Sequence, residues 1–228
     1  MPKTLLTAHS GCDGTQDNSM AYVDYALSLD VNCIEVDIRM DKHGVLILSH
    51  DEGPGHAQLD QAFSALKGHP EKRINCDFKQ ADLEQDVWAL AQKMDVERQL
   101  VFSGTVSEAI AKTEPDIFHY VQWFVNIELL FPQIKTMGLA DAVNALGYMC
   151  MADKLQKYIS DTGACCINTH HSIARTPLYQ ELLNRKVNIS VWTPDDEDAV
   201  KDFVHDGVYN ITTRNARRIS KMVQELFN

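Results

Sequence analysis

The sequence predicts a single-domain α/β protein with the architecture of a (β/α)8 TIM barrel. Short β-branched or apolar runs of strand length recur along the whole chain of 228 residues, and helical patterns separate them. Eight strand–helix alternations in a chain of this length are typical of such a barrel. The motifs GxGxxG and GxxxxGK[ST], which would favour the rival doubly wound open sheet, are both absent from the sequence.

Each predicted strand is a run of β-branched, aromatic or aliphatic residues, and the runs are 4–10, 33–40, 73–79, 99–104, 122–129, 164–170, 188–193 and 209–213. Helical patterns are predicted at 19–29, 58–68, 82–95, 106–113, 138–161, 176–186, 196–206 and 215–227. Asn18 or Ser19 is a suitable cap for the first of these helices. The turn Asp41-Lys42-His43-Gly44 joins the second strand to an additional strand at 45–50. No linker, repeat or break divides the chain, so residues 1–228 are predicted to form one domain.

Composition and charge limit the classes of partner. A formal net charge of −11 argues against nucleic acid or an anionic membrane surface. The six cysteines show no CxxC pair or regular spacing, which indicates neither a zinc site nor a disulfide framework and fits a reducing compartment. The first residues are too short and polar a stretch for a signal peptide, and no apolar run reaches the roughly 18 residues of a spanning helix. We therefore expect a cytoplasmic protein without a stable membrane anchor.

Polar side chains gather where the predicted strands end, which is the end of such a barrel that carries chemistry. They are His9, Glu35, Asp37, His50, Asp77, Lys79, Ser103, Asn126, Glu128, His170, Trp192, Thr212 and Thr213. Because side chains alternate along a strand, Glu35 and Asp37 share one face. Asp77 and Lys79 repeat this spacing on the next strand. Three carboxylates at one barrel mouth would repel each other unless a cation binds, and oxygen ligands favour Mg²⁺ or Ca²⁺ over zinc.

Each of these residues also has a plain structural interpretation. Alone, Glu35 and Asp37 suit an edge strand with solvent-facing side chains equally well. Alone, Asp77 more often forms an ion pair with Lys79 or with a nearby arginine, and a tryptophan such as Trp192 is most often packed in a core. The prediction of a site therefore depends on the combination of these residues.

That combination, in this order, resembles the glycerophosphodiester phosphodiesterase family, whose members are metal-dependent TIM barrels that split a phosphodiester into an alcohol and a phosphomonoester. The family's H-R-G strand end, E-x-D strand and H-D strand end correspond to His9-Ser10-Gly11, Glu35-Val36-Asp37 and His50-Asp51. Its E-x-K, W-T-x-N and G-x-D-G-I-x-T-D strands correspond to Asp77-Phe78-Lys79, Trp192-Thr193-Pro194-Asp195 and residues 207–214. The resemblance spans nearly the whole chain.

The resemblance implies a small-molecule phosphodiester substrate and a role for each matched residue. Glu35, Asp37 and Asp77 are implied as ligands of a divalent metal, Mg²⁺ or Ca²⁺, with Mn²⁺ as a further candidate. His9 and His50 are implied as the acid/base pair, and two imidazoles suit such roles near neutral pH. Lys79 is implied near the phosphate, and the further candidates for contact with substrate are Ser10, Trp192 and His170. The substrate alcohol and the oligomeric state stay open.

Three departures from the family pattern affect these expectations. Ser10 replaces an arginine, so Lys79 and the metal, or an arginine from another loop (Arg39, Arg175 or Arg214), would have to hold the phosphate. Asp77 replaces a glutamate and is one methylene shorter. The segment between His50 and Asp77 is short, so we expect an open pocket mouth.

The alternative functions that remain are a phospholipid headgroup-cleaving enzyme, a non-catalytic barrel that binds a phosphorylated ligand, and a different metal-dependent barrel enzyme such as a lyase.

Overall fold

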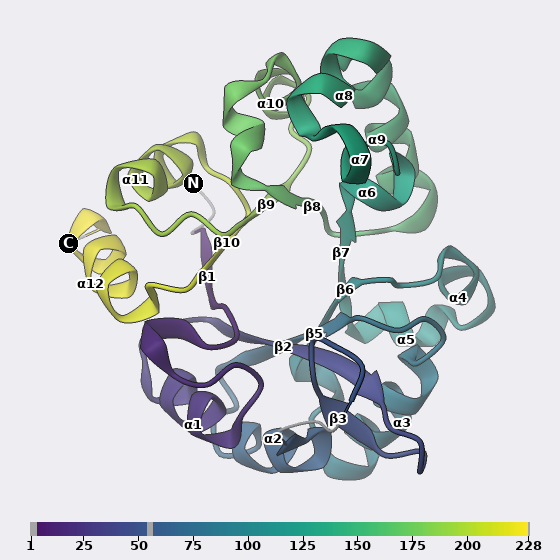
Figure 1. Cartoon of the computed structure of the whole chain (residues 1–228), viewed down its shortest axis with the longest axis vertical. Helices are drawn as coiled ribbons and strands as arrows, with labels where there is room; N and C mark the ends of the chain where they lie inside the picture. Colours follow the sequence, from purple (N-terminus) through teal and green to yellow (C-terminus); the bar gives the residue numbers. More distant parts are fainter. Residues whose placement is uncertain (1–3, 54–56, 228) are drawn as a thin grey trace.

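The computed structural model describes residues 4–53 and 57–227, and these form a closed barrel of eight parallel strands (Figure 1). The barrel strands are β1 (Leu5–Ala8), β2 (Cys33–Met40), β5 (Arg73–Phe78), β6 (Leu100–Gly104), β7 (Gln122–Asn126), β8 (Cys166–His170), β9 (Ile189–Trp192) and β10 (Asn210–Thr213). Each strand pairs with the next in this order, and β1 pairs with both β10 and β2, which closes the cylinder. The predicted (β/α)8 barrel is confirmed.

Helices surround the barrel on its outer side (Figure 1). They are α1 (Met20–Ser28), α2 (Leu59–Leu66), α3 (Glu84–Met94), α4 (Glu108–Thr113), α5 (Pro115–Tyr120), α6 (Ile127–Leu130), α7 (Ile134–Met137), α8 (Leu139–Leu146), α9 (Tyr148–Thr162), α10 (Pro177–Asn184), α11 (Glu197–Asp206) and α12 (Ala216–Phe227). Short 3-10 turns occupy Cys12–Gly14, Glu97–Gln99 and His171–Arg175. Each of these helices is too short or too polar to cross a bilayer, as judged over the described residues.

The core lies between the barrel and the helices, where apolar side chains such as Leu27, Phe63 and Leu155 are fully or almost fully buried. Two of the surrounding helices begin at a residue whose side chain caps the first turn. The Ser19 hydroxyl accepts a hydrogen bond from the backbone N–H of Tyr22 at 3.1 Å, which confirms the predicted cap of α1. Asp196 caps α11 in the same way, by accepting two backbone N–H groups.

The additional strand is present as β3 (Leu46–Leu48), which pairs antiparallel with β2. The turn between them is held by the Asp41 carboxylate, which accepts hydrogen bonds from the backbone N–H groups of His43 and Val45. A further short strand, β4 (Ala57–Gln58), pairs with β3. This antiparallel extension carries the chain to His50 beside the barrel mouth.

The structure differs from the sequence prediction after the fifth barrel strand. The strand predicted at 122–129 ends at Asn126, where pairing with β8 ends, and α6 follows directly. Ile127 and Leu130 are buried at helical spacing, so the helix satisfies the core and Glu128 lies on a helix rather than on the strand. The helix predicted at 138–161 is divided into α8 and α9 at Gly147, which has a positive φ of 80°. Helix α5 was not predicted.

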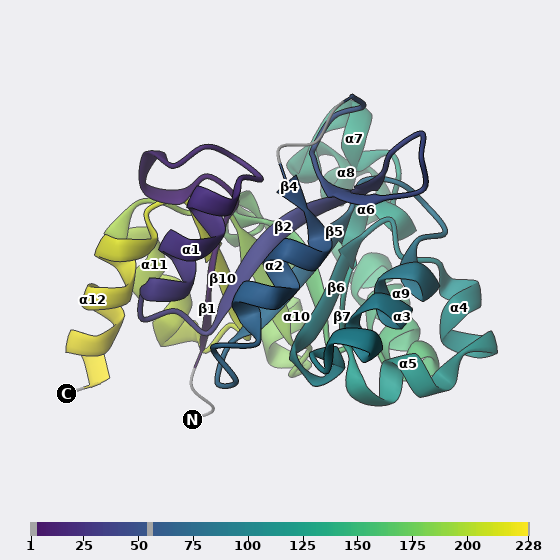
Figure 2. The ribbon, with the colours of Figure 1, turned by 90° about the horizontal axis from the view of Figure 1, so that it is seen from below.

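Loops that follow the strands gather at one end of the barrel. Figure 2 shows the β1–α1 loop, the β2–β3 hairpin and helices α6 to α8 projecting from this end, whereas α12 runs toward the opposite end. The carboxyl ends of the parallel strands open at the same end as these loops, so their terminal side chains meet there.

Candidate active site

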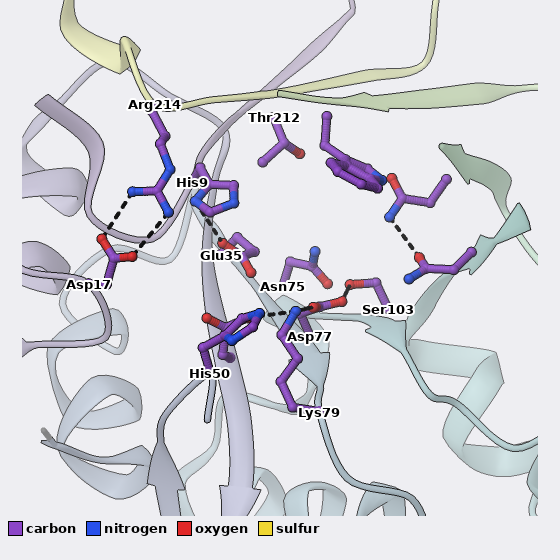
Figure 3. A pocket seen from close by; sticks show the side chains of 14 residues that line it. His9, Asp17, Glu35, His50, Asn75, Asp77, Lys79, Ser103, Thr212 and Arg214 are labelled. Atoms are coloured by element: carbon purple, nitrogen blue, oxygen red, sulfur yellow. Dashed lines mark hydrogen bonds and ion pairs between the residues drawn. The ribbon is translucent and has the colours of Figure 1, made fainter. Parts of the chain in front are cut away.

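A cavity of about 310 Å³ opens at the carboxyl ends of the barrel strands (Figure 3). Every barrel strand, or the loop directly after it, contributes to its wall. The lining residues are His9, Asp17, Glu35, Asp37, His50, Asn75, Asp77, Lys79, Ser103, Asn126, Asn168, Trp192, Thr212 and Arg214. The cavity is therefore a polar pocket with charges of both signs.

Three carboxylates converge at the floor of this cavity. Glu35 and Asp37 lie on β2 and Asp77 lies on β5, and one oxygen of each lies within 4.8 Å of the others. The register of the two strands produces this cluster, since Asp37 is directly opposite Asp77 and Glu35 is opposite Asn75. The side chains of Glu35 and Asp37 are buried. The predicted convergence of the three acids is thus present in the folded chain.

Each carboxylate is held by a different neighbour. The backbone N–H of Ser10 donates to Glu35 Oε2 at 2.9 Å. Asn18 donates from Nδ2 to Asp37 Oδ2 at 2.8 Å and accepts the Asp37 backbone N–H at 3.0 Å. The Ser103 hydroxyl donates to Asp77 Oδ1 at 2.6 Å. Each of these hydrogen bonds occupies one side-chain oxygen of an acid and leaves its second oxygen for another partner.

Lys79 is the cation that the chain itself supplies to this cluster. Its Nζ lies 3.0 Å from Asp37 Oδ1 and 2.5 Å from Asp77 Oδ2. Burial alone would lower the pKa of Lys79, but Asp77 and Asp37 outweigh this effect and raise the pKa above its usual value. Burial, reinforced by Asp37 and Asp77, raises the pKa of Glu35 well above the usual carboxyl value. One ammonium is thus too little positive charge for three ionised carboxylates, and two negative charges remain for a divalent cation to balance.

Asn75 adds a neutral oxygen to the same region. The residue is buried, and its side-chain oxygen has no hydrogen-bond partner. A buried unpaired carbonyl oxygen is costly, and a bound cation is one of the few groups that relieve this cost. Oxygen donors from carboxylates and an amide are the ligands that Mg²⁺, Ca²⁺ and Mn²⁺ prefer. The residues present therefore fit a hard divalent metal.

The two predicted catalytic histidines both line the cavity (Figure 3). His9 Nδ1 lies 2.8 Å from the carbonyl oxygen of Ser10, so this nitrogen carries the proton and donates, and Nε2 keeps its lone pair. Burial lowers the pKa of His9 below its usual value, which favours the neutral ring. His50 is mostly exposed, and its Nδ1 lies 2.9 Å from Asp51 Oδ1. The two imidazoles thus differ in burial and in partner.

The four residues predicted to contact substrate or phosphate divide into two groups. Lys79 and Trp192 line the cavity, whereas Ser10 and His170 are not part of its wall. Ser10 is fully buried and its hydroxyl accepts the backbone N–H of Asn18 at 2.8 Å, so it supports the loop rather than facing the pocket. His170 Nδ1 lies 2.9 Å from the Ser172 hydroxyl, and its ring packs 5.0 Å from that of Trp192.

Sequence reasoning missed three residues of the cavity wall. Asn75 lies two positions before Asp77, and the alternation of side chains along a strand was sufficient to place both on one face. Asn168 donates to Asn126 across β7 and β8 at 2.8 Å. Asp17 lies in a segment that loosely matches the family's P-E-N-T helix start, but its two-point ion pair with Arg214 could not be predicted, since the two residues are 197 positions apart.

Comparisons with known proteins agree with this architecture. No protein-family model matches the chain. A glycerophosphodiester phosphodiesterase of Arabidopsis thaliana is 21% identical to it over 270 residues, covering 97% of this chain and 74% of that protein. A phosphodiesterase of Oleispira antarctica, solved with the product sn-glycerol 3-phosphate, has a TM-score of 0.68 and 13% identity, with 97% of each chain covered.

Two further solved structures are similar over nearly their whole length. A glycerophosphodiester phosphodiesterase of Thermotoga maritima has a TM-score of 0.66 and 15% identity, with 97% of this chain and 99% of that chain covered. One from Parabacteroides distasonis has a TM-score of 0.72 and 15% identity, with 99% of each chain covered. The fold is therefore the barrel seen in these structures, and the predicted resemblance to the glycerophosphodiester phosphodiesterase family is confirmed.

Proposed function

We propose that this chain, which resembles the glycerophosphodiester phosphodiesterases over nearly its whole length, is a phosphoric diester hydrolase that cleaves a glycerophosphodiester-like substrate into an alcohol and a phosphomonoester. The observation that carries the proposal is the convergence of Glu35, Asp37 and Asp77 in a cavity that His9 and His50 also line. Each part of this set answers a need of phosphodiester cleavage: charge neutralisation, proton removal and proton delivery.

The three acids would hold a divalent metal, with the Asn75 side-chain oxygen as a further ligand. Mg²⁺ and Ca²⁺ are the first candidates and Mn²⁺ is another, because all three prefer oxygen donors. When bound, such a cation supplies a Lewis acid that stabilises the charge developing on the phosphoryl oxygens. Lys79 holds Asp37 and Asp77 in place and keeps part of its ammonium free for an oxygen of the substrate.

The two histidines suit opposite proton transfers. His9 is held through Nδ1 by the Ser10 carbonyl, so its Nε2 lone pair is available to take a proton from the attacking hydroxyl group. The hydroxyl belongs either to water or to the substrate alcohol itself. His50 is more exposed and its Nδ1 is oriented by Asp51, so when the ring is protonated at both nitrogens its Nε2–H can be transferred to the departing alkoxide. We therefore assign His9 as the general base and His50 as the general acid of the cleavage step.

The cavity supports a small substrate. Its volume of about 310 Å³ is close to the lower end of typical ligand pockets. A second hollow of about 400 Å³ shares His50, Asp77, Lys79, Asn126 and Trp192 with the first, so the leaving alcohol has space to extend outward. The open mouth expected from the short segment after His50 is consistent with this arrangement.

The test is hydrolysis of bis(p-nitrophenyl) phosphate and of a glycerophosphodiester by the purified protein with Mg²⁺, Mn²⁺ or Ca²⁺. We expect turnover with at least one of these metals, loss of turnover in EDTA and recovery after excess metal is added. Turnover that is insensitive to EDTA would contradict the metal centre. Binding of metal and phosphate without turnover of either substrate would favour the non-catalytic alternative.

A further inference from the structure

An anionic substrate needs a positive group in this cavity besides Lys79, which is already engaged by two carboxylates. The position at which the resembling family carries an arginine is Ser10, and this side chain is fully buried with its hydroxyl occupied. A neutral buried hydroxyl cannot replace the two-point contact of a guanidinium with phosphate. A two-point guanidinium contact with the phosphate can therefore come only from another arginine of the chain.

The structure separates the three arginines that the sequence analysis named for this phosphate contact. Arg39 donates from Nε to the His50 carbonyl and lines two neighbouring grooves rather than the catalytic cavity. Arg175 lines a separate hollow next to Asp202 and Asp206. Arg214, on the loop after β10, lines the catalytic cavity together with His9. Among the described residues, Arg214 is the one arginine that lines the catalytic cavity.

An end-on ion pair with Asp17 orients the Arg214 side chain. Its Nη1 and Nη2 each donate to one oxygen of Asp17 at 3.0 Å (Figure 3). A guanidinium has five N–H donors, so three remain, including the Nε–H on the edge that Asp17 does not cover. The Arg214 side chain is 42% exposed, so a ligand can reach these donors.

The backbone around this pair is also fixed. The Arg214 backbone N–H donates to Asp195 Oδ1 at 2.8 Å, and its carbonyl accepts the backbone N–H of Asp13 at 2.7 Å. Gly11 lies directly beneath the pair, since a Cβ built there would stand 1.6 Å from Asp17 Oδ1 and 3.1 Å from Arg214 Nη1. Because Gly11 has no side chain, the ion pair of Asp17 and Arg214 can lie against its backbone.

We propose that Arg214 is a further substrate-binding residue, whose free guanidinium edge contacts the non-bridging oxygens of the substrate phosphate and of the phosphomonoester product beside His9. Asp17 is its positioning residue. This inference rests on the proposed function, because it names the group that holds the phosphate of that reaction. It also explains how the site tolerates serine at position 10.

The competing interpretation is that the pair only fastens the β1–α1 loop to the loop after β10. Two substitutions separate these interpretations, because each one breaks the pair but changes the charge in the opposite direction. Arg214→Gln removes a positive charge and Asp17→Asn removes a negative charge. A mere fastening predicts that the two variants differ only by the salt-screened effect of their opposite charge changes, whereas a phosphate-binding arginine predicts that Arg214→Gln binds much more weakly.

The experiment is calorimetric titration of inorganic phosphate and of sn-glycerol 3-phosphate into the full chain saturated with metal. We expect Arg214→Gln to weaken phosphate binding about 10- to 100-fold, the size of a lost hydrogen bond to a charged group. The Kd of Arg214→Gln should exceed that of Asp17→Asn by about tenfold or more. A smaller ratio would overturn the inference. Arg218→Gln is the matched control, since Arg218 pairs with Glu197 and does not line the cavity.

Thermal melts show whether each variant is folded. If Arg214→Gln is unfolded, Arg214→Lys takes its place, because lysine retains the charge but not the planar fork. Weaker phosphate binding by the lysine variant supports the inference, and unchanged binding overturns it. Because these titrations need no turnover, they separate this inference from the proposed function. Phosphate binding that depends on Arg214 in a protein without diesterase activity would refute the function alone.

Discussion

At the scale of single residues, the site is a set of charges that neutralise each other incompletely. Glu35, Asp37 and Asp77 face one ammonium, Lys79, and the hydrogen bonds from Ser10, Asn18 and Ser103 stabilise particular oxygens without adding formal charge. Burial of unpaired charge costs several kcal/mol, so such a cluster is stable only if a cation binds or a carboxyl group is protonated. Burial, reinforced by the negative charges of Asp37 and Asp77, accordingly raises the pKa of Glu35.

Asn75→Leu tests whether the unpaired amide oxygen belongs to the metal site. We expect metal affinity to fall, by less than in Glu35→Gln, because an amide contributes no formal charge. The metal-free variant should be at least as stable as the parent, since the substitution removes a buried oxygen that has no partner. Titration of Mn²⁺ and thermal melts in EDTA measure the two quantities. Unchanged Mn²⁺ affinity would remove Asn75 from the ligand set.

The burial of His9 predicts the acid side of the pH–rate profile. Its pKa lies below the usual value of 6.5, and a nearby metal would lower it further. A general base works in its neutral form, so kcat/KM should stay high as the pH falls to 6.5 and decline only below it. His9→Gln should abolish most of the activity, and the acid limb of the pH–rate profile should disappear from the activity that remains. A limb centred above 6.5 that disappears in His9→Gln would contradict this assignment.

At the scale of elements, the register of β2 against β5 and of β5 against β6 decides which polar groups meet. Asp77 is paired with Asp37 on one side and with Ser103 on the other. A shift of one residue would turn these side chains to the outer face of the barrel. Gly104, the last residue of β6, ends this pairing with a positive φ of 80°.

Gly104→Ala should be strongly destabilising because the new Cβ would stand 2.3 Å from the Phe78 carbonyl oxygen and 2.6 Å from its backbone nitrogen. Strain at positive φ and the clash with backbone together predict a loss of about 2–4 kcal/mol. Gly163→Ala is the matched control, since Gly163 also has a positive φ but open space around it, and about 1 kcal/mol is expected there. Urea unfolding measures both losses. Equal losses would show that backbone contact at Gly104 is unimportant.

At the scale of the whole molecule, barrel closure brings distant segments into one cavity. The first strand pairs with the last, so the loop that carries Asp17 meets the loop that carries Arg214 (Figure 1). The acids lie at the mouth of this closed cylinder on β2 and β5, so a cation held by them would contact two of its strands at once. Metal binding should therefore stabilise the entire fold.

The melting temperature should rise when EDTA is replaced by metal. At a free metal concentration about 100 times the Kd, binding to the folded state alone contributes about 2.7 kcal/mol. For a protein of this size this corresponds to a rise of roughly 5–10 °C. Differential scanning calorimetry in Mg²⁺, Ca²⁺ and Mn²⁺ measures the shift, and Glu35→Gln is the comparison in which most of it should be lost. No shift with any of the three ions would refute the metal centre.

Much of this protein was determined by its sequence alone. The alternation of strand and helix patterns predicted the barrel, because eight strand–helix units in a chain of this length are typical of a closed parallel sheet covered by helices. The two-residue spacing of Glu35 and Asp37, repeated by Asp77 and Lys79, predicted a shared acidic face, because side-chain direction along a strand has a period of two.

Other features depended on the tertiary structure. Only the closed barrel brought Asp17 to Arg214, buried Ser10 behind the loop that it supports, and left the Asn75 oxygen without a partner. Helix α6 likewise replaced the end of a predicted strand because burial of Ile127 and Leu130 outweighed local β propensity. Local periodicity specifies which face a side chain takes, whereas the packing of distant segments decides which faces meet.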